Sequence, residues 1–266
     1  MTTEVMIYRF YAQTDPGLTR QNNEDAVSFD EATGVAVLAD GMGGYNAGEV
    51  ASSMATSIIN TEMNRWLAET GAAATVQDIR RALEICVSTA NAAVYQAARA
   101  NAHYSGMGTT LVTGVFRGAD LVIGHIGDSR CYRLRQGELV QITRDHSLLQ
   151  EQIDAGLLTP EQAALSMNKN LVTRALGVDD AVLLEVHEHS VEPGDVYLMC
   201  SDGLSDMVRD QEIAKILQQP LPPEQRANAL VDTANAHGGR DNITVLLVQV
   251  EVGAEKRGLM ARLLGK

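Results

Sequence analysis

Cysteine is scarce in this chain of 266 residues, which has only three. Their number is odd, they stand far apart, and each lies in an apolar or strand-like run. This pattern argues against a disulfide framework and against a zinc site. We therefore expect Cys86, Cys131 and Cys200 to be buried thiols in a reducing compartment.

The sequence also lacks signals for export and for membrane insertion. No apolar run approaches the length of a membrane-spanning helix. The first ten residues have neither the basic start nor the apolar stretch and cleavage site of a secretory signal. Repeats, low-complexity blocks and proline-rich linkers are missing as well. These absences favour a cytoplasmic protein with a single domain within residues 1–251 and a short basic tail at 252–266.

Positive charge is in short supply, because 21 Lys and Arg face 34 Asp and Glu, giving a formal net charge of −13. Nucleic acid is therefore a poor partner, since its phosphates need Lys and Arg. Apolar residues make up 45% of the chain, which is enough for a buried core. The acidic residues become informative only where they converge.

Short apolar and β-branched runs recur along the chain and predict strands. Turn sequences at residues 117–120 and 136–137 separate neighbouring runs at hairpin distances, so we expect largely antiparallel sheets. The runs that favour strands most are residues 35–39, 111–116, 121–125, 131–134, 182–186, 196–200 and 243–250.

Two longer segments have helical periodicity. A capping-box-like start at Thr75 and Asp78 opens the second, which should run antiparallel to the first because only residues 70–74 join them. The first helix is expected at residues 47–69, with an apolar face containing Val50, Met54, Ile58 and Leu67. A later pair is expected at residues 211–217 and 223–236.

The segment at residues 145–177 is more polar than its surroundings. It contains a short predicted helix at 147–155, with Asp145 near its cap and Gly156 as its stop. A flap over a site and an ordinary surface helix with a loop explain this pattern equally well.

Aspartates stand at four strand boundaries. Asp40 and Asp202 each follow a predicted strand, whereas Asp241 precedes one. Asp128 lies in a turn between two strands. Antiparallel pairing puts the end of one strand beside the start of the next, so these acids are expected to meet at one sheet edge. Glycines beside them allow the backbone to approach a ligand closely, although a single Asp-Gly is usually a plain turn.

Carboxylates packed so closely repel one another unless a cation neutralises them. Oxygen donors without Cys or His at ligand spacing select Mg²⁺ or Mn²⁺ over zinc. Two such ions about 3.5–4 Å apart would clamp a phosphate and lower the pKa of a water between them. Arg20 has the planar fork that binds phosphoryl oxygens, and without the acids it would read as a surface arginine.

Seven short motifs occur along the chain in an order that resembles the type 2C metal-dependent protein phosphatases, and their bacterial members most closely. The resemblance covers the chain from about Arg9 to Val250. The motifs are Arg20 with Asn23-Glu24-Asp25, Asp40-Gly41-Met42-Gly43-Gly44, Gly106-Met107-Gly108-Thr109-Thr110, Gly127-Asp128-Ser129-Arg130, Leu171-Val172-Thr173-Arg174-Ala175-Leu176-Gly177, Ser201-Asp202-Gly203-Leu204 and Arg240-Asp241-Asn242.

The resemblance implies an α+β fold, with a central antiparallel β-sandwich and a helix pair on each outer face. It implies an enzyme that hydrolyses phosphoserine and phosphothreonine with a metal-activated water. The cofactors would be two tightly bound Mn²⁺ or Mg²⁺ ions and a third, weaker one. The partners would be phosphoproteins, among them a bacterial Ser/Thr kinase and its targets, and we expect a monomer that binds no membrane.

Individual roles follow by position from the same resemblance. Asp40 would bridge two metal ions, and the Gly41 carbonyl would bind one of them. Asp202 and Asp241 would hold one metal, and Asp202 would share the third ion with Asp128.

The remaining motif residues surround this centre. Glu24 and Asp25 would act on the other ion through water. Arg20 would hold the substrate phosphate, and residues 145–177 would form the variable flap that is tied to substrate choice.

Two departures from the family pattern matter. Met42 stands where animal members carry a histidine proposed as a general acid, and a thioether cannot donate a proton. Leaving-group protonation must then come from metal-bound water or another group. Residues 166–170 replace a basic run found in several bacterial flaps. His146 lies near the flap, where a hydrogen-bonded structural histidine is the better interpretation than a proton donor.

Two other functions fit the sequence less well. A non-catalytic relative would lack metal acids or the phosphate arginine, yet every matched position is filled. A carboxylate-metal nuclease would need a basic groove, which the net charge of −13 disfavours. The tail at residues 253–266 is interpreted as frayed, with a small amphipathic docking helix as the alternative.

Overall fold

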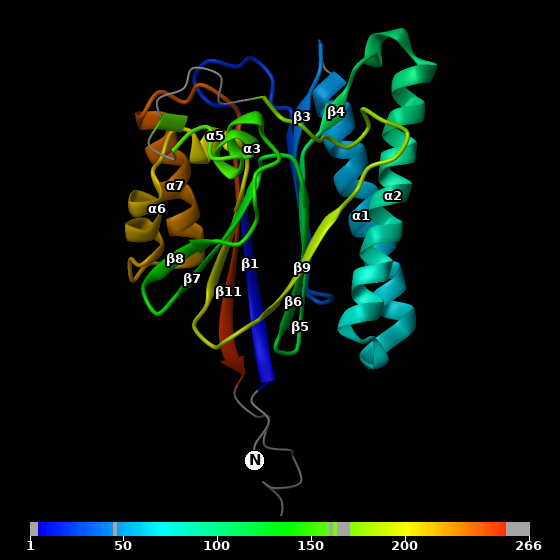
Figure 1. Cartoon of the computed structure of the whole chain (residues 1–266). Helices are drawn as coiled ribbons and strands as arrows, with labels where there is room; N and C mark the ends of the chain where they lie inside the picture. The colour runs from blue at the N-terminus through cyan, green and yellow to red at the C-terminus, as the bar shows by residue number, and fades with distance from the viewer. Residues whose placement is uncertain (1–4, 45–46, 160–161, 164–170, 254–266) are drawn as a thin grey trace, which may run out of the picture.

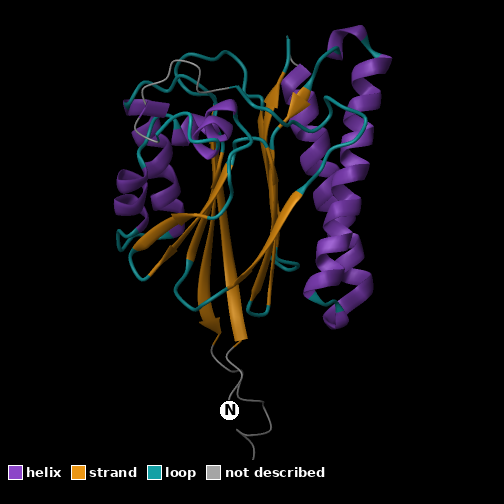
Figure 2. Cartoon of the chain, viewed as in Figure 1, coloured by secondary structure: helices purple, strands orange, loops and turns teal. Residues whose placement is uncertain are grey.

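Two antiparallel sheets pack face to face, and helices cover the outside of each (Figures 1 and 2). The computed structural model describes residues 5–44, 47–159, 162–163 and 171–253. The layers follow the predicted order of helix, sheet, sheet and helix. Among the described residues, no helix combines the length and apolar character needed to cross a membrane.

The first sheet has the strand order β1-β11-β10-β7-β8. All its pairings are antiparallel, and β1 and β11 pair along their whole length. Its strands are β1 (Val5–Asp15), β7 (Arg130–Arg135), β8 (Glu138–Gln141), β10 (Val196–Cys200) and β11 (Ile243–Gly253).

The second sheet has the order β2-β3-β5-β6-β9, with β4 paired to the end of β3. The core between the two sheets includes Phe116 and Tyr197, whose rings meet edge to face at 5.2 Å. Its strands are β2 (Asp25–Asp30), β3 (Val35–Met42), β4 (Gly108–Thr109), β5 (Leu111–Arg117), β6 (Asp120–Ile126) and β9 (Glu185–Ser190).

One predicted strand was misplaced. Residues 182–186 were expected to pair, but β9 begins only at Glu185. Val182 and Leu184 instead pack into the core between the second sheet and its helices, which explains their apolar pattern. The hairpin turns were predicted correctly, and Gln136 and Gly137 adopt positive φ angles of 52° and 85° between β7 and β8.

Each helix pair covers one sheet. The helices α1 (Ala47–Thr70) and α2 (Val76–Ala100) pack on the second sheet, with the short turn η1 (Gly71–Ala73) between them. The helices α6 (Asp210–Leu217) and α7 (Pro223–Ala236) pack on the first. Further helical elements among the described residues include η2 (Ala102–Tyr104), α3 (Leu148–Asp154) and α5 (Asp202–Ser205).

The predicted start of α2 is confirmed, because Thr75 and Asp78 form a reciprocal capping box. The predicted face of α1 was shifted. Its fully buried side is built largely from small residues, whereas the larger Val50, Met54 and Ile58 are only partly buried. Small side chains let a helix approach its sheet closely, so side-chain size misled the prediction. The buried side includes Ala51, Ser52, Ala55, Thr56 and Ile59.

All three cysteines are buried and free of disulfides, as expected. Burial raises the pKa of Cys86 to about 11 and that of Cys200 to about 12. Burial also raises the pKa of Cys131 well above its usual value. The thiols are therefore protonated at neutral pH and are poor nucleophiles.

Two boundaries needed correction. Ser147, rather than Asp145, caps α3, because its hydroxyl accepts from the Gln150 N–H at 3.2 Å. Strand β11 continues to Gly253, beyond its expected end at Val250. The replaced flap run at 166–170 and the tail at 254–266 lie outside the described residues.

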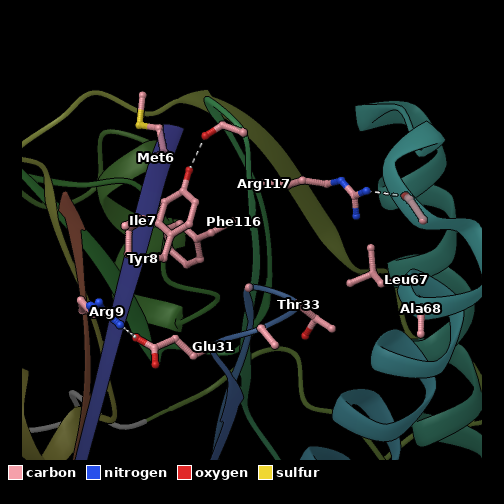
Figure 3. A pocket seen from close by; sticks show the side chains of 14 residues that line it. Met6, Ile7, Tyr8, Arg9, Glu31, Thr33, Leu67, Ala68, Phe116 and Arg117 are labelled. Atoms are coloured by element: carbon pink, nitrogen blue, oxygen red, sulfur yellow. Dashed lines mark hydrogen bonds and ion pairs between the residues drawn. The ribbon is translucent and has the colours of Figure 1, made fainter. Parts of the chain in front are cut away.

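A hollow of about 940 Å³ lies at the end of the sandwich where β1 and β3 begin (Figure 3). Tyr8 and Phe116 line it, and the Tyr8 hydroxyl donates to the Gly118 carbonyl at 2.8 Å. Arg9 and Glu31 form an ion pair of 3.4 Å at its side. None of the predicted site residues lines this hollow.

Candidate metal centre

Carboxylates from both sheets meet at the opposite end of the sandwich, where β3 and β10 end. Asp25 and Asp40 are direct partners in the β2–β3 ladder of the second sheet. Asp202 begins α5 after β10, and Asp241 precedes β11, the neighbour of β10 in the first sheet. The expected meeting at one sheet edge was therefore wrong, because the acids converge from two sheets.

Asp128 joins the two groups. It lies in the turn between β6 of the second sheet and β7 of the first, and its side chain is buried. A second link is made by Ser201, whose hydroxyl donates to Asp25 Oδ2 at 2.7 Å. The chain thus crosses between its sheets at the same end where the carboxylates gather.

The cluster is electrostatically strained. Burial raises the pKa of Asp25 to about 6, and burial and the nearby Asp145 raise that of Asp128 to about 6. Burial, then the neighbouring carboxylates, raises the pKa of Asp40 and Asp202 well above the usual value. These shifts arise because burial removes water from the ionised forms and because the neighbouring negative charges outweigh the nearby positive ones.

Asp40 is the carboxyl that the others surround. After burial, the causes of its raised pKa are the charges of Asp25, Asp202, Asp128 and Asp241. Asp25 Oδ1 is enclosed and has no hydrogen-bond partner among the described residues. A set of oxygen donors in need of positive charge fits a hard divalent cation.

Hydroxyl groups fix the main chain of Asp40. The Asp40 carbonyl accepts from Thr109 Oγ1 at 2.8 Å and from the Thr110 N–H at 2.9 Å. The Asp40 N–H donates to Thr110 Oγ1 at 3.0 Å. The sequence did not predict a role for these threonines, although both belong to the Gly106–Thr110 motif.

Gly41 brings its backbone against Glu24 and the start of α1. Its N–H donates to the Glu24 carbonyl at 3.1 Å. A Cβ atom at Gly41 would lie 2.1 Å from the Gly48 carbonyl oxygen, so no side chain fits. Asn242 completes the arrangement, because its Oδ1 accepts from the Glu24 N–H at 2.8 Å. Asn242 belongs to the Arg240-Asp241-Asn242 motif, but its positioning of Glu24 was not predicted.

Arg20 lies at the rim of the cluster. Its Nη2 is 2.7 Å from Asp241 Oδ2, and its side chain is 52% exposed. The guanidinium is therefore both close to the acids and accessible to a substrate that approaches from solvent.

Beside Asp128 is a second acidic recess, a pocket of about 400 Å³. Asp206 is a member that sequence reasoning missed, although it stands four residues after Asp202 across the short α5 helix. Arg130 partly balances the recess through its 2.7 Å ion pair with Asp145. The acids that line it are Asp128, Asp145, Asp202, Asp206 and Asp210.

The raised pKa of Asp128 makes the stability of metal-free protein depend on pH. A carboxyl group with a higher pKa in the folded state stabilises the fold fully below its unfolded pKa, and that contribution is lost as the pH rises through about 6. Relative to wild type in EDTA, Asp128→Asn should gain about 2 kcal/mol in free energy of unfolding between about pH 4 and pH 7. Urea denaturation at a series of pH values measures the free energy of unfolding of both proteins. Plots of this free energy against pH that run parallel for the two proteins would contradict the prediction.

Comparison with known proteins agrees with this geometry. The model of the protein phosphatase 2C family matches residues 18–235. The serine/threonine phosphatase stp of Listeria innocua is 36% identical over 240 residues, which cover 89% of this chain and 94% of the relative. The serine/threonine protein phosphatase PstP of Mycobacterium tuberculosis is 40% identical over 251 residues, which are 94% of this chain but 46% of that longer protein.

Solved structures give the same result. The crystal structure of Mycobacterium tuberculosis PstP has a TM-score of 0.83 at 39% identity and covers 92% of this chain and 99% of that one. The crystal structure of Staphylococcus aureus Stp1 has a TM-score of 0.84 at 32% identity and covers 94% of this chain and 98% of that one. The catalytic domain of PstP, with a TM-score of 0.80, was solved in complex with two manganese ions.

The α+β sandwich and the family resemblance seen in the motifs are thus both confirmed. The chain belongs to the protein phosphatase 2C family and is a metal-dependent serine/threonine protein phosphatase.

Proposed function

We propose that the carboxylate cluster around Asp40 is the dinuclear Mn²⁺ or Mg²⁺ centre of this enzyme, and that it hydrolyses phosphoserine and phosphothreonine in proteins. The convergence of carboxylates from both sheets around Asp40 carries the proposal, since Asp25 is its direct partner across the β2–β3 ladder while Asp202 and Asp241 come from the other sheet. A bridging ligand must lie between two cations, and Asp40 is the acid with neighbours from both sheets. Bound divalent ions would supply an activated water and neutralise phosphoryl oxygens.

The protein's own residues divide the work of holding such a centre. Asp40 and the Gly41 carbonyl would contact the ions directly, and Asp202 with Asp241 would complete one ion's ligands. Glu24 and Asp25 would act through water on the other. The hydroxyls of Ser201 and Thr110 keep these groups in place before any ion binds.

Arg20 is proposed to bind the substrate phosphate. Its exposure and its 2.7 Å contact with Asp241 place a planar cation at the rim of the acids. A phosphoryl group offers this planar fork paired oxygens like those of the carboxylate, so it can take the same place.

Asp128 is proposed to assist protonation of the leaving group. Met42 at the end of β3 has no proton to donate. The acidic recess beside Asp128 has the oxygen donors for a loosely held third cation, with its water as the acid. This role would matter most for alkoxide leaving groups.

The partners proposed for the enzyme are phosphoproteins of a bacterial cytoplasm, including a Ser/Thr kinase and its targets. It is proposed to act as a monomer without membrane or nucleic-acid partners, in keeping with its net charge of −13. Comparing the phosphoproteomes of Asp202→Asn and wild-type strains would identify the substrates.

Metal dependence tests the proposed centre. Para-nitrophenyl phosphate should be hydrolysed with Mn²⁺ and not in EDTA, and Asp40→Asn should reduce kcat by about two orders of magnitude or more. Asp120→Asn, an exposed acid at the other end of the sandwich, is the matched control and should retain wild-type kcat. Full activity after rigorous chelation, or wild-type kcat in Asp40→Asn, would rule out the assignment.

Arg20 should separate binding from chemistry. A phosphate clamp acts in the ground state and the transition state alike, so Arg20→Ala should mainly raise KM for phosphopeptides, by about tenfold. Arg20→Lys keeps the positive charge but not the planar fork, so its KM for phosphopeptides should lie between those of Arg20→Ala and wild type. Steady-state kinetics with Mn²⁺ give both constants, and a large loss of kcat at constant KM would contradict the clamp.

Asp128 should affect substrates according to their leaving groups. Asp128→Ala should keep the two tight ions, measured by calorimetry with Mn²⁺. It should slow phosphopeptide turnover by about tenfold and para-nitrophenyl phosphate turnover much less, because nitrophenolate needs no proton. Equal losses on both substrates would remove the proton-delivery role, and loss of both tight ions would make Asp128 a ligand of the main centre.

A further inference from the structure

Histidines gather beside the turn that carries Asp128. His125 lies on β6, and Glu185, His187 and His189 alternate along the neighbouring strand β9 and share one face. His146, between β8 and α3, stacks on His125 with ring centroids 4.7 Å apart. The proposed chemistry uses none of these side chains.

The hydrogen bonds of His146 define its tautomer. Its Nε2 lies 3.0 Å from Glu185 Oε2, which accepts, so Nε2 carries the proton. Nδ1 is then a lone pair, and it accepts the Gly127 N–H at 3.2 Å. Arg174 Nη1 is 3.5 Å from the same Nε2, too far to compete with the carboxylate.

Glu185 is anchored from both sides. His187 Nε2 lies 2.8 Å from its Oε1, while His146 occupies Oε2. Partial burial raises the pKa of Glu185, but the hydrogen bonds from the two histidines outweigh it and lower that pKa to about 2. Glu185 is thus an ionised acceptor that fixes the His146 ring.

The donor set of His125, His146 and Glu185 resembles a metal site, since its ligand atoms lie within 4.8 Å of one another. Two features argue against that use in this arrangement, although the buried His125 Nδ1 has no hydrogen-bond partner among the described residues. The two rings are stacked at 18°, so their in-plane lone pairs run side by side rather than converge. Both nitrogens of His146 are also engaged, and His125 Nε2 lies 2.7 Å from the Arg144 carbonyl oxygen. The cluster is a hydrogen-bond network.

This network holds Gly127 from two sides. The His146 main-chain N–H donates to the Gly127 carbonyl at 2.9 Å, while its side chain accepts the Gly127 N–H. On the other side, a Cβ at Gly127 would lie 2.7 Å from Thr110 Cγ2, and Thr110 is bonded to Asp40. Gly127 has a positive φ of 97°, so its geometry depends on these contacts.

The same histidine closes the base of segment 145–177. Its carbonyl accepts the Thr173 N–H at 2.8 Å. Next to it, Ser147 bridges to Val172, and the Leu148 N–H donates to the Leu171 carbonyl at 2.9 Å. The entry and exit of the segment therefore meet at His146.

We propose that His146, whose tautomer is set by Glu185, is a positioning residue that holds the Asp128 turn and the base of segment 145–177 in one geometry for catalysis. Asp128 follows Gly127 directly, so a shift of the Gly127 peptide reorients its carboxylate. The catalytic part of this inference rests on the proposed role of Asp128, whereas the positioning part rests on the contacts of Gly127 alone.

Two near-isosteric variants separate the bonds of His146. In His146→Asn, Oδ1 occupies the place of Nδ1 and still accepts the Gly127 N–H, but the bond to Glu185 is lost. In His146→Gln, the amide reaches the place of Nε2 and keeps the bond to Glu185, but it offers Gly127 no acceptor. His187→Asn, which touches the same carboxylate and not Gly127, is the matched control.

Hydrogen exchange of the Gly127 amide, followed by NMR on the full chain, tests positioning without any assay of activity. His146→Gln should accelerate exchange of the Gly127 amide by about tenfold, because one hydrogen bond is lost. In His146→Asn and in the His187→Asn control, the exchange rate should stay near that of wild type. Equal exchange in the Asn and Gln variants would overturn the proposal.

Kinetics with Mn²⁺ test the consequence for catalysis. His146→Gln should lower kcat for phosphopeptides by about tenfold and leave kcat for para-nitrophenyl phosphate nearly unchanged, as expected for Asp128→Ala. His146→Asn should keep most of the wild-type kcat for phosphopeptides. If His146→Gln alters exchange of the Gly127 amide but leaves the ratio of kcat for phosphopeptides to kcat for para-nitrophenyl phosphate unchanged, the catalytic part of the proposal is wrong. If Asp128→Ala shows no substrate difference, the proposed role of Asp128 fails, and the exchange result still decides the positioning part.

Discussion

Mutual repulsion among carboxylates at one end of the sandwich is the constraint around which this structure is organised. Asp40 is affected by four neighbouring acids, and water is too scarce there to screen them. A flexible arrangement would relieve the repulsion by moving the side chains apart. The protein prevents this with uncharged groups that grip the main chain, namely Thr109, Thr110, Ser201 and Asn242. The repulsion therefore remains available to attract cations.

The sandwich suits this purpose because its two sheets are held together by an independent apolar core. Phe116 and Tyr197 pack between the sheets, away from the acids, with Leu38 and Met199 beside them. Close packing of this kind resists small displacements. The core can therefore withstand the electrostatic strain at one end without the sheets separating.

The gathering of the acids could be predicted from sequence because charged residues beside glycines at strand ends are conspicuous. The sequence could not show that Asp25 and Asp40 belong to one sheet and Asp202 and Asp241 to the other, since strand order depends on contacts far apart along the chain. Ser201 and Thr110 belong to recognised motifs, but their supporting roles were not predicted because a hydroxyl group has no distinctive pattern. In the fold, the start of β9 was misplaced because the apolar residues before it pack against the helices instead of pairing in the sheet. The buried face of α1 was misplaced because small residues form its contact with the sheet.

The long pairing of β1 with β11 has a consequence for how the domain can be joined to other structures. Strand β11 begins beside Asp241 and ends at Gly253, where it pairs with Val5 at the start of β1. Eleven residues of extended chain span about 35 Å, so both ends of the described fold lie that far from the acids. A partner domain, a linker or an anchor attached there would leave the catalytic end open to large phosphoproteins. The architecture thus permits tethering without obstruction of substrate access.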